Sequence, residues 1–218
     1  RDVERSRGLG DVYKRQALVR WFHEQKGFIS PGQFIPALEK GGYISELDRY
    51  MIEKVTGCLD QRRAEKKRFV PVSVNLSWMD FYDENMLEWI VRGLKKNNPN
   101  EQKIRFEITE TSLAAIGENH TRMLMHLKEN GAEILLDDFG SGYSSFGMLQ
   151  DYDFDILKMD ISFVRNIGVN KKSESILRAI IDMAHQLGIR LVAEGAETEE
   201  QVAFLRANGC DYIQGYYY

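Results

Sequence analysis

The stretch EILLDDFG, residues 133–140, decides the fold, because an apolar run that reads as a strand ends in two adjacent carboxylates. Four more strand-like runs end in polar or charged side chains: VPVSVNLS (70–77), KIRFEITE (103–110), DILKMD (155–160) and RLVAEGAE (190–197). When parallel strands end this way, their carboxyl ends converge on one face, which is how a (β/α)8 barrel builds an active site. The oxygen donors favour hard divalent cations such as Mg²⁺ or Mn²⁺.

The order of elements also favours a barrel. Right-handed β–α–β crossovers make the strands of such a chain parallel. A closed barrel has eight strands in about 250 residues, so six strands in 218 residues predict an incomplete TIM-type α/β barrel. Strands are expected at 69–76, 103–109, 133–138, 155–159, 189–194 and 211–217, and helices at 34–40, 45–64, 83–96, 118–130, 144–150, 173–187 and 198–208.

Composition excludes several classes of function. A formal net charge of −4 provides no basic field, so we expect no DNA partner. The four histidines lie away from the carboxylate-bearing strand ends, which argues against a zinc site. The two cysteines, Cys58 and Cys210, have no paired spacing, and reduced thiols indicate a cytoplasmic protein. No apolar run approaches the roughly 18 residues of a membrane span, although a parent protein with a membrane anchor upstream is compatible with this sequence.

The first sixteen residues, RDVERSRGLGDVYKRQ, differ from the rest of the chain, because they are charged and show no strand alternation. We interpret residues 1–16 as translated sequencing-adaptor sequence and exclude them from the fold prediction. The alternative is a natural, divergent N-terminus. The predicted domain therefore comprises residues 17–218.

Eight motifs occur in register along this domain and resemble the EAL-domain family of bacterial cyclic-di-GMP phosphodiesterases. The resemblance implies a (β/α)8 barrel whose first two strands would precede Ala17, and a gene fragment truncated at both ends. The motifs are ALVRW (17–21), SPGQFIPALEKGGYI (30–44), VNLS (74–77), FEITET (106–111), DDFGSGYSS (137–145), LKMD (157–160), AEGAETEEQ (193–201) and GCDYIQGYYY (209–218).

The resemblance also implies roles for individual residues around two Mg²⁺ or Mn²⁺ ions. Asn75, Glu107 and Asp137 correspond to ligands of the first ion, and Asp137 would bridge to a second ion shared with Asp138 and Glu194. Two ions about 3.5–4 Å apart can hold the attacking and leaving oxygens of a phosphodiester. Further residues expected to serve catalysis are Lys158, which would orient the attacking water, Glu194, and Glu110, which would anchor the loop after Asp138 without being a ligand; Arg20 and Gln214 would contact the substrate.

The residues also allow plainer interpretations. Asn75 alone could cap a turn, since Asn favours such positions. The adjacent carboxylates Asp137 and Asp138 could pair with Lys158 in an internal salt bridge. Glu107 is the hardest to explain without a cation, because a buried carboxylate is costly. Elsewhere, Thr198 is expected to cap a helix, with Gln201 completing a capping box and Glu199 and Glu200 complementing the helix dipole.

One departure from the family pattern concerns the signature Glu-Ala-Leu, which here reads Gln16-Ala17-Leu18. The signature glutamate is a metal ligand, and a neutral amide is a poorer one for Mg²⁺. We therefore expect this chain to hydrolyse cyclic di-GMP to linear pGpG slowly or not at all. The alternatives are a degenerate cyclic-di-GMP-binding sensor and an unrelated barrel lyase or phosphotriesterase. By resemblance, the loop 139–145 implies a homodimer, and a parent protein could carry sensor or GGDEF-type domains upstream.

Overall fold

The computed structural model describes residues 15–67, 70–96, 104–116, 121–142 and 145–217. The interpretation of residues 1–14 as adaptor sequence lies outside the described residues, as do the first positions of the strands expected to begin at 69 and 103. None of the described helices is long and apolar enough to cross a lipid bilayer.

Within the described residues, seven parallel strands form one curved sheet in the order β1-β4-β5-β6-β7-β8-β9. The six predicted strands are confirmed as β4 to β9, so the incomplete barrel is confirmed. The seventh, β1, was missed because it lies in the excluded segment. The strands are β1 (Arg15–Gln16), β4 (Val72–Asn75), β5 (Ile104–Thr109), β6 (Glu133–Phe139), β7 (Ile156–Met159), β8 (Arg190–Glu194) and β9 (Tyr212–Gln214).

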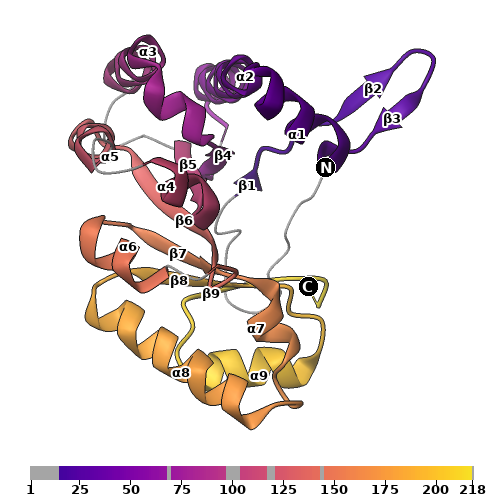
Figure 1. The fold of residues 1–218 in the computed structure, drawn as a ribbon, viewed down its shortest axis with the longest axis vertical. Helices are drawn as coiled ribbons and strands as arrows, with labels where there is room; N and C mark the ends of the chain where they lie inside the picture. Colours follow the sequence, from indigo (N-terminus) through magenta and orange to yellow (C-terminus); the bar gives the residue numbers. More distant parts are fainter. Residues whose placement is uncertain (1–14, 68–69, 97–103, 117–120, 143–144, 218) are drawn as a thin grey trace.

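Helices lie on the outside of the curved sheet, so the inner face stays open to side chains from the strands (Figure 1). Every helix expected from the sequence is present, with shifts of a few residues at its ends. The capping box of Thr198 and Gln201 is also confirmed. The helices are α1 (Pro31–Gly41), α2 (Ile44–Ala64), the 3-10 turn η1 (Trp78–Tyr82), α3 (Glu84–Lys96), α4 (Glu110–Ile116), α5 (Thr121–Glu129), α6 (Ser145–Asp151), α7 (Ile161–Arg165), α8 (Lys171–Gln186) and α9 (Glu199–Ala207).

Side chains on the inner face follow the two-residue period of a strand, which sorts them into layers. Along β6, the side chains of Glu133, Leu135 and Asp137 share one face, from the amino end to the carboxyl end. Leu135 packs with Ile156 of β7 and Val192 of β8 in a small, fully buried apolar cluster. This cluster separates a charged layer at the amino ends of the strands from a second charged layer at their carboxyl ends.

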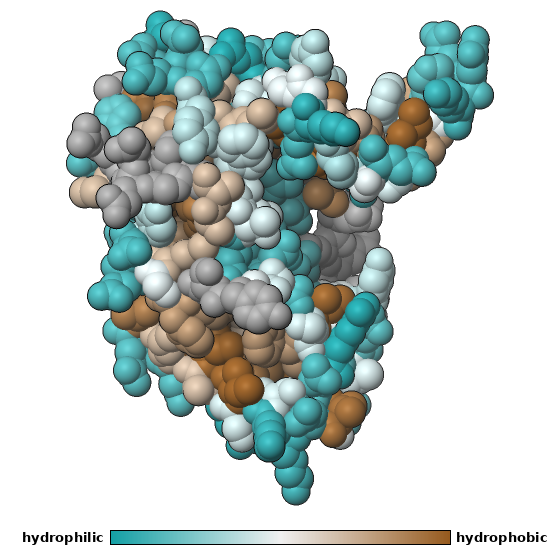
Figure 2. Space-filling model, in the orientation of Figure 1, coloured by the Kyte–Doolittle hydropathy of each residue, from teal (hydrophilic) through white to brown (hydrophobic). Residues whose placement is uncertain are grey.

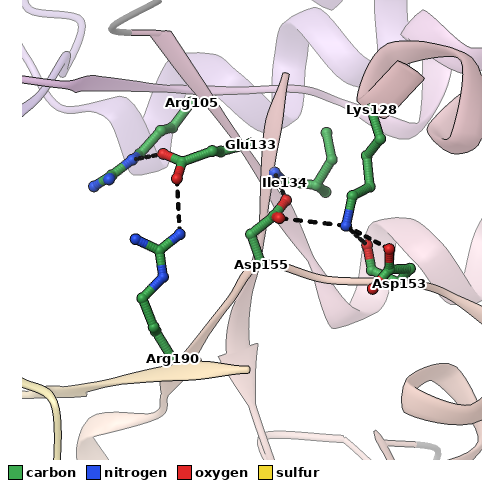
Figure 3. Close-up of polar contacts among 7 residues, drawn as sticks. All are labelled: Arg105, Lys128, Glu133, Ile134, Asp153, Asp155 and Arg190. Carbon is green, nitrogen blue, oxygen red and sulfur yellow. Dashed lines mark hydrogen bonds and ion pairs between the residues drawn. The ribbon is translucent and has the colours of Figure 1, made fainter. Parts of the chain in front are cut away.

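The charged layer at the amino ends holds neighbouring strands together (Figure 3). Glu133 of β6 pairs with Arg105 of β5, and its Oε1 also lies 2.7 Å from Nη2 of Arg190 on β8. Nearby, Lys128 Nζ lies 3.3 Å from Asp155 Oδ1, and Asp155 Oδ2 accepts a hydrogen bond from the backbone N–H of Ile134 at 2.8 Å. Because positive and negative charges are paired here, this end of the barrel is a stabilising network.

A short antiparallel hairpin, β2 (Trp21–His23) and β3 (Gly27–Ile29), was not predicted. Figure 2 shows it projecting from the rest of the molecule. The ring of Trp21 packs edge-on against Phe34 of α1, with 5.5 Å between the ring centroids. This contact fixes the base of the hairpin beside β1 and the carboxyl end of β4.

Candidate active site

The centre of the candidate site is the ammonium group of Lys158, on β7. Its Nζ lies 2.8 Å from Asp137 Oδ1, 2.8 Å from Glu194 Oε1 and 3.4 Å from Glu107 Oε2. These side chains come from four neighbouring strands, β5 to β8. Lys158 is only 2% exposed. The structure thus brings one cation and three of the predicted carboxylates together in a buried cluster at the carboxyl ends of the strands.

The charges in this cluster stabilise one another. Burial alone would lower the pKa of Lys158, but the negative charges of Glu107, Asp137 and Glu194 outweigh that effect and hold the pKa above its ordinary value. Lys158 therefore stays protonated over the whole physiological range. The plain interpretation of a salt bridge between Asp137 and Lys158 describes a contact that is present in the structure.

Glu107, which is 1% exposed, has a second partner that the sequence did not reveal. The side-chain amide of Gln16 donates a hydrogen bond to Glu107 Oε2 at 2.5 Å. Gln16 lies on β1, which pairs with β4, the strand next to β5. The desolvation of Glu107 is therefore offset by Lys158 and by an amide at the position of the signature glutamate.

The adjacent carboxylates Asp137 and Asp138 both face this cluster because β6 is irregular at its end. The register between β6 and β7 shifts after Leu136, and Asp138 has a φ of 55°, in the left-handed region. A bulge of this kind re-aims a side chain that would otherwise point to the opposite face. Burial and the negative charge of Asp137 raise the pKa of Asp138 to about 6, with a smaller opposing effect from Lys158. The site therefore holds more negative charge than Lys158 can neutralise.

Two predicted residues join the cluster through strand register. Asn75, the last residue of β4, is paired with Glu107 on β5, and Gln214, the last residue of β9, is paired with Glu194 on β8. The side-chain Oε1 of Gln214 is buried and accepts no hydrogen bond from the described residues. A buried acceptor of this kind usually has a partner, so it is available to a ligand donor.

Arg20 lies further from Lys158 than the carboxylates do. It is exposed, and its Nη1 donates a hydrogen bond to the carbonyl of Val19 at 3.0 Å. Together with Asn75 it lines a pocket of about 210 Å³ beside the cluster, which also includes Thr109 and Ser112. The geometry places Arg20 at the rim of the site, where a guanidinium can reach an anionic group.

Glu110 is buried and contacts the loop that follows Asp138. Its Oε2 accepts hydrogen bonds from the backbone N–H groups of Gly140 at 3.1 Å and Gly142 at 3.3 Å. A Cβ atom added to Gly142 would lie 2.8 Å from Glu110 Oε1, so the loop needs glycine there. The geometry matches the expected role of a loop anchor.

The donor atoms fit a hard cation in type, although they are not arranged around a common centre. In the part of the chain that the structure describes, no three His, Cys, Asp or Glu side chains are placed to hold a metal ion directly. The carboxylates converge on Lys158 instead. Carboxylate and amide oxygens are nevertheless the donor atoms that Mg²⁺ and Mn²⁺ prefer.

Sequence reasoning missed two features near the site. Asp160 caps α7, accepting a hydrogen bond from Ser162 N at 2.8 Å, and its charge contributes to the raised pKa of Asp138. Its position two residues after Lys158 was the signal that could have revealed it. The other feature is the pair Asp48 and Asp80, both of which accept the backbone N–H of Ser77, at 3.2 and 2.9 Å. These residues come from α2 and η1, and only the folded chain brings them together.

Comparison with known proteins also points to the EAL-domain family. The EAL-domain family model matches residues 7–218. The chain is 33% identical over 207 residues to cyclic di-GMP phosphodiesterase NbdA of Pseudomonas aeruginosa, an alignment that covers 95% of this chain and 26% of NbdA. The chain spans about a quarter of the length of such relatives.

Solved structures show the same fold. The MucR phosphodiesterase in complex with c-di-GMP is 31% identical, with a TM-score of 0.81, and the match covers 95% of this chain and 84% of that one. The Klebsiella pneumoniae BlrP1 manganese/c-di-GMP complex is 25% identical, with a TM-score of 0.70, over 80% of this chain and 44% of that one.

Proposed function

Because the chain belongs to the EAL-domain family, we propose that it acts on cyclic di-GMP, hydrolysing one phosphodiester bond to give linear pGpG. The observation that carries this proposal is the buried cluster of Glu107, Asp137 and Glu194 around Lys158 at the carboxyl ends of parallel strands. Active sites of barrel enzymes lie at this end. The structural relative MucR is a phosphodiesterase that binds c-di-GMP, which supports the same ligand for this chain.

The proposal includes two Mg²⁺ or Mn²⁺ ions. Asn75, Glu107 and Asp137 would hold the first, and Asp137, Asp138 and Glu194 the second. When bound, such a pair supplies a nucleophilic water at neutral pH and neutralises charge on the phosphoryl oxygens. The relative BlrP1 forms a manganese/c-di-GMP complex, which supports Mn²⁺ as the kind of ion.

Lys158 would orient the attacking water. An ammonium group has three N–H donors, and the three carboxylates take all of them in the present arrangement. The contact with Glu107 is the longest, at 3.4 Å, and we expect this one to be exchanged for the water. The short contacts to Asp137 and Glu194 would keep the ammonium aimed at the mouth of the site.

Arg20 and Gln214 would bind the substrate. The planar guanidinium of Arg20, on the rim, suits a phosphate oxygen. Gln214 offers a buried Oε1 without a partner among the described residues, which suits an N–H donor such as a guanine edge. The homodimer and the upstream domains implied by the family resemblance stay predictions.

A second candidate, a cyclic-di-GMP-binding sensor with little turnover, is favoured by one contact. The uncharged side chain of Gln16 cannot balance the charge of a cation, and its amide N–H donates a hydrogen bond to Glu107 instead. The cluster can therefore be satisfied without an ion at this position. In the same chain, Gln16→Glu should increase the requirement for a cation and raise the hydrolytic rate.

The test is chromatographic separation of cyclic di-GMP from pGpG after incubation with Mn²⁺ or with a chelator. We expect slow, Mn²⁺-dependent conversion that Gln16→Glu accelerates and Glu107→Ala abolishes. Glu133→Gln is the matched control, because Glu133 is a carboxylate on the same inner face at the opposite end of the barrel. Tight binding of cyclic di-GMP without conversion, in both the chain and Gln16→Glu, would replace the hydrolase with the sensor.

A further inference from the structure

The short helix α7 directly follows the strand that carries Lys158 and lies on the same side of the sheet as α8 and α9 (Figure 1). Val164, which is fully buried, anchors this helix in the core. The backbone N–H of Asp160, just before α7, donates to the carbonyl of Phe139 at 3.3 Å. The helix is thus fixed to the core through Val164 and to the end of β6 through Asp160.

Two side chains of α7 pack against glycines in the neighbouring loops. A Cβ atom added to Gly195 would lie 2.2 Å from Cγ1 and 2.4 Å from Cδ1 of Ile161. A Cβ atom added to Gly140 would lie 2.4 Å from Cε2 of Phe163. Both glycines have positive φ, 79° and 88°, so any other residue would also be strained. These contacts leave no space for a side chain at either glycine.

The spacing of Ile161 and Phe163 explains how one helix reaches two loops. Residues two apart on an α-helix point about 200° from each other, so the two side chains leave α7 on opposite sides. The strands on either side of β7 are β6 and β8. Gly195 follows Glu194 at the end of β8, and Gly140 comes two residues after Asp138 at the end of β6.

We propose that Ile161 and Phe163 are positioning residues that set the separation between Asp138 and Glu194. Phe163 packs against Gly140 in the loop after β6, and the carboxylate of Glu110 accepts a hydrogen bond from the backbone N–H of the same glycine. Ile161 holds the loop after β8. This role rests on the proposed function, because Asp138 and Glu194 are the residues assigned to the second cation.

The test is a titration of the intact chain with Mn²⁺, in which binding is measured from the electron paramagnetic resonance signal of the Mn²⁺ that stays free. The second site is identified as the one that Glu194→Gln removes. Ile161→Ala and Phe163→Ala should raise the dissociation constant of that site about tenfold or more, as for other residues that orient metal ligands. Val164→Ala is the matched control on the same helix, because it removes buried volume without touching either glycine.

Control measurements separate positioning from general stability. Val164→Ala should lower the melting temperature at least as much as the other two variants, yet change the dissociation constant less than about twofold. If Ile161→Ala or Phe163→Ala fails to fold, Ile161→Val and Phe163→Leu replace them with the same expected ranking. Equal effects of all three positions on Mn²⁺ binding would overturn the proposal.

A rescue experiment gives a second readout. Gly195→Ala should weaken the second site because its Cβ meets Ile161. Ile161→Ala removes Cγ1 and Cδ1, the two closest atoms, and leaves only Cβ at 3.2 Å, so the double variant should bind Mn²⁺ more tightly than Gly195→Ala alone. Independent sites would give additive losses, and additive losses would contradict direct packing. If the parent chain binds no Mn²⁺, the proposed function fails as well, which distinguishes that result from failure of this inference alone.

Discussion

Replacing Lys158 with methionine removes the positive charge that contacts Glu107, Asp137 and Glu194 together. Breaking a buried ion pair by removing one partner destabilises a protein by about 3–5 kcal/mol, because the remaining charge stays buried. The effect should fall mainly on Glu107, whose side chain is 0% exposed, against 13% for Asp137 and 24% for Glu194. We expect Lys158→Met to lower the free energy of unfolding by an amount within this range.

The assay is urea unfolding at pH 7 in the presence of a chelator, followed by tryptophan fluorescence. Lys128→Met is the matched control, since Lys128 also contacts two carboxylates, Asp153 at 2.7 Å and Asp155 at 3.3 Å. Asp153 is 85% and Asp155 26% exposed, so water screens both contacts more than those of Lys158, and the control should lose about 1 kcal/mol. Adding Mn²⁺ should then stabilise Lys158→Met more than the parent, because a bound cation replaces the lost charge; at 100 times the dissociation constant, one ion contributes about 2.7 kcal/mol.

Two results would refute this reasoning. One is a Lys158→Met protein that is no less stable than Lys128→Met in chelator. The other is equal stabilisation of parent and Lys158→Met by Mn²⁺, which would mean that the carboxylates around Lys158 are not where the ion binds.

Three further variants test charged groups at both ends of the barrel. Gln16→Glu places a carboxylate beside Glu107, so it should lower the unfolding free energy in chelator and increase the stabilisation by Mn²⁺, both measured by thermal melting. Burial and the charge of Asp80 raise the pKa of Asp48 to about 9. The folded chain therefore keeps a proton on Asp48 that the unfolded chain loses above about pH 4. The free energy of unfolding should consequently fall as the pH rises. Asp48→Asn has nearly the same shape and does not titrate. Its free energy of unfolding, relative to the parent, should therefore increase between pH 5 and 8 by at most about 1.4 kcal/mol per pH unit. A difference that stays constant with pH would contradict the raised pKa. Burial would raise the pKa of Glu133, but its two arginine partners outweigh burial and hold the pKa below its ordinary value. Glu133→Gln should therefore lower the free energy of unfolding by about 1–2 kcal/mol at pH 7. Urea titrations at a series of pH values should show this loss shrinking as the pH falls below about 4.

The strands and most of the site could be predicted because their signals are local. In β6, apolar side chains followed by Asp137 and Asp138 mark both the strand and its functional end. The two-residue period then places Glu107 and Lys158 on the same inner face as Asp137. The capping box of Thr198 is equally local, and it is present as expected.

The features that were missed depend on partners far away in the sequence. The two-residue strand that contains Gln16 exists only through pairing with β4. The direct contacts of Glu107 and Glu194 with Lys158, which the sequence did not indicate, depend on the register of the four strands β5 to β8. The orientation of Asp138 depends on a bulge and a left-handed backbone, which no pattern of residue types specifies.

The most direct measurement is anomalous X-ray diffraction from crystals of the chain soaked in Mn²⁺ and cyclic di-GMP. The account predicts two manganese peaks about 3.5–4 Å apart, bound by oxygens of Glu107, Asp137, Asp138 and Glu194, with a phosphate of the dinucleotide beside them. Manganese bound only elsewhere, with Lys158 still held by all three carboxylates while the dinucleotide is bound, would contradict it.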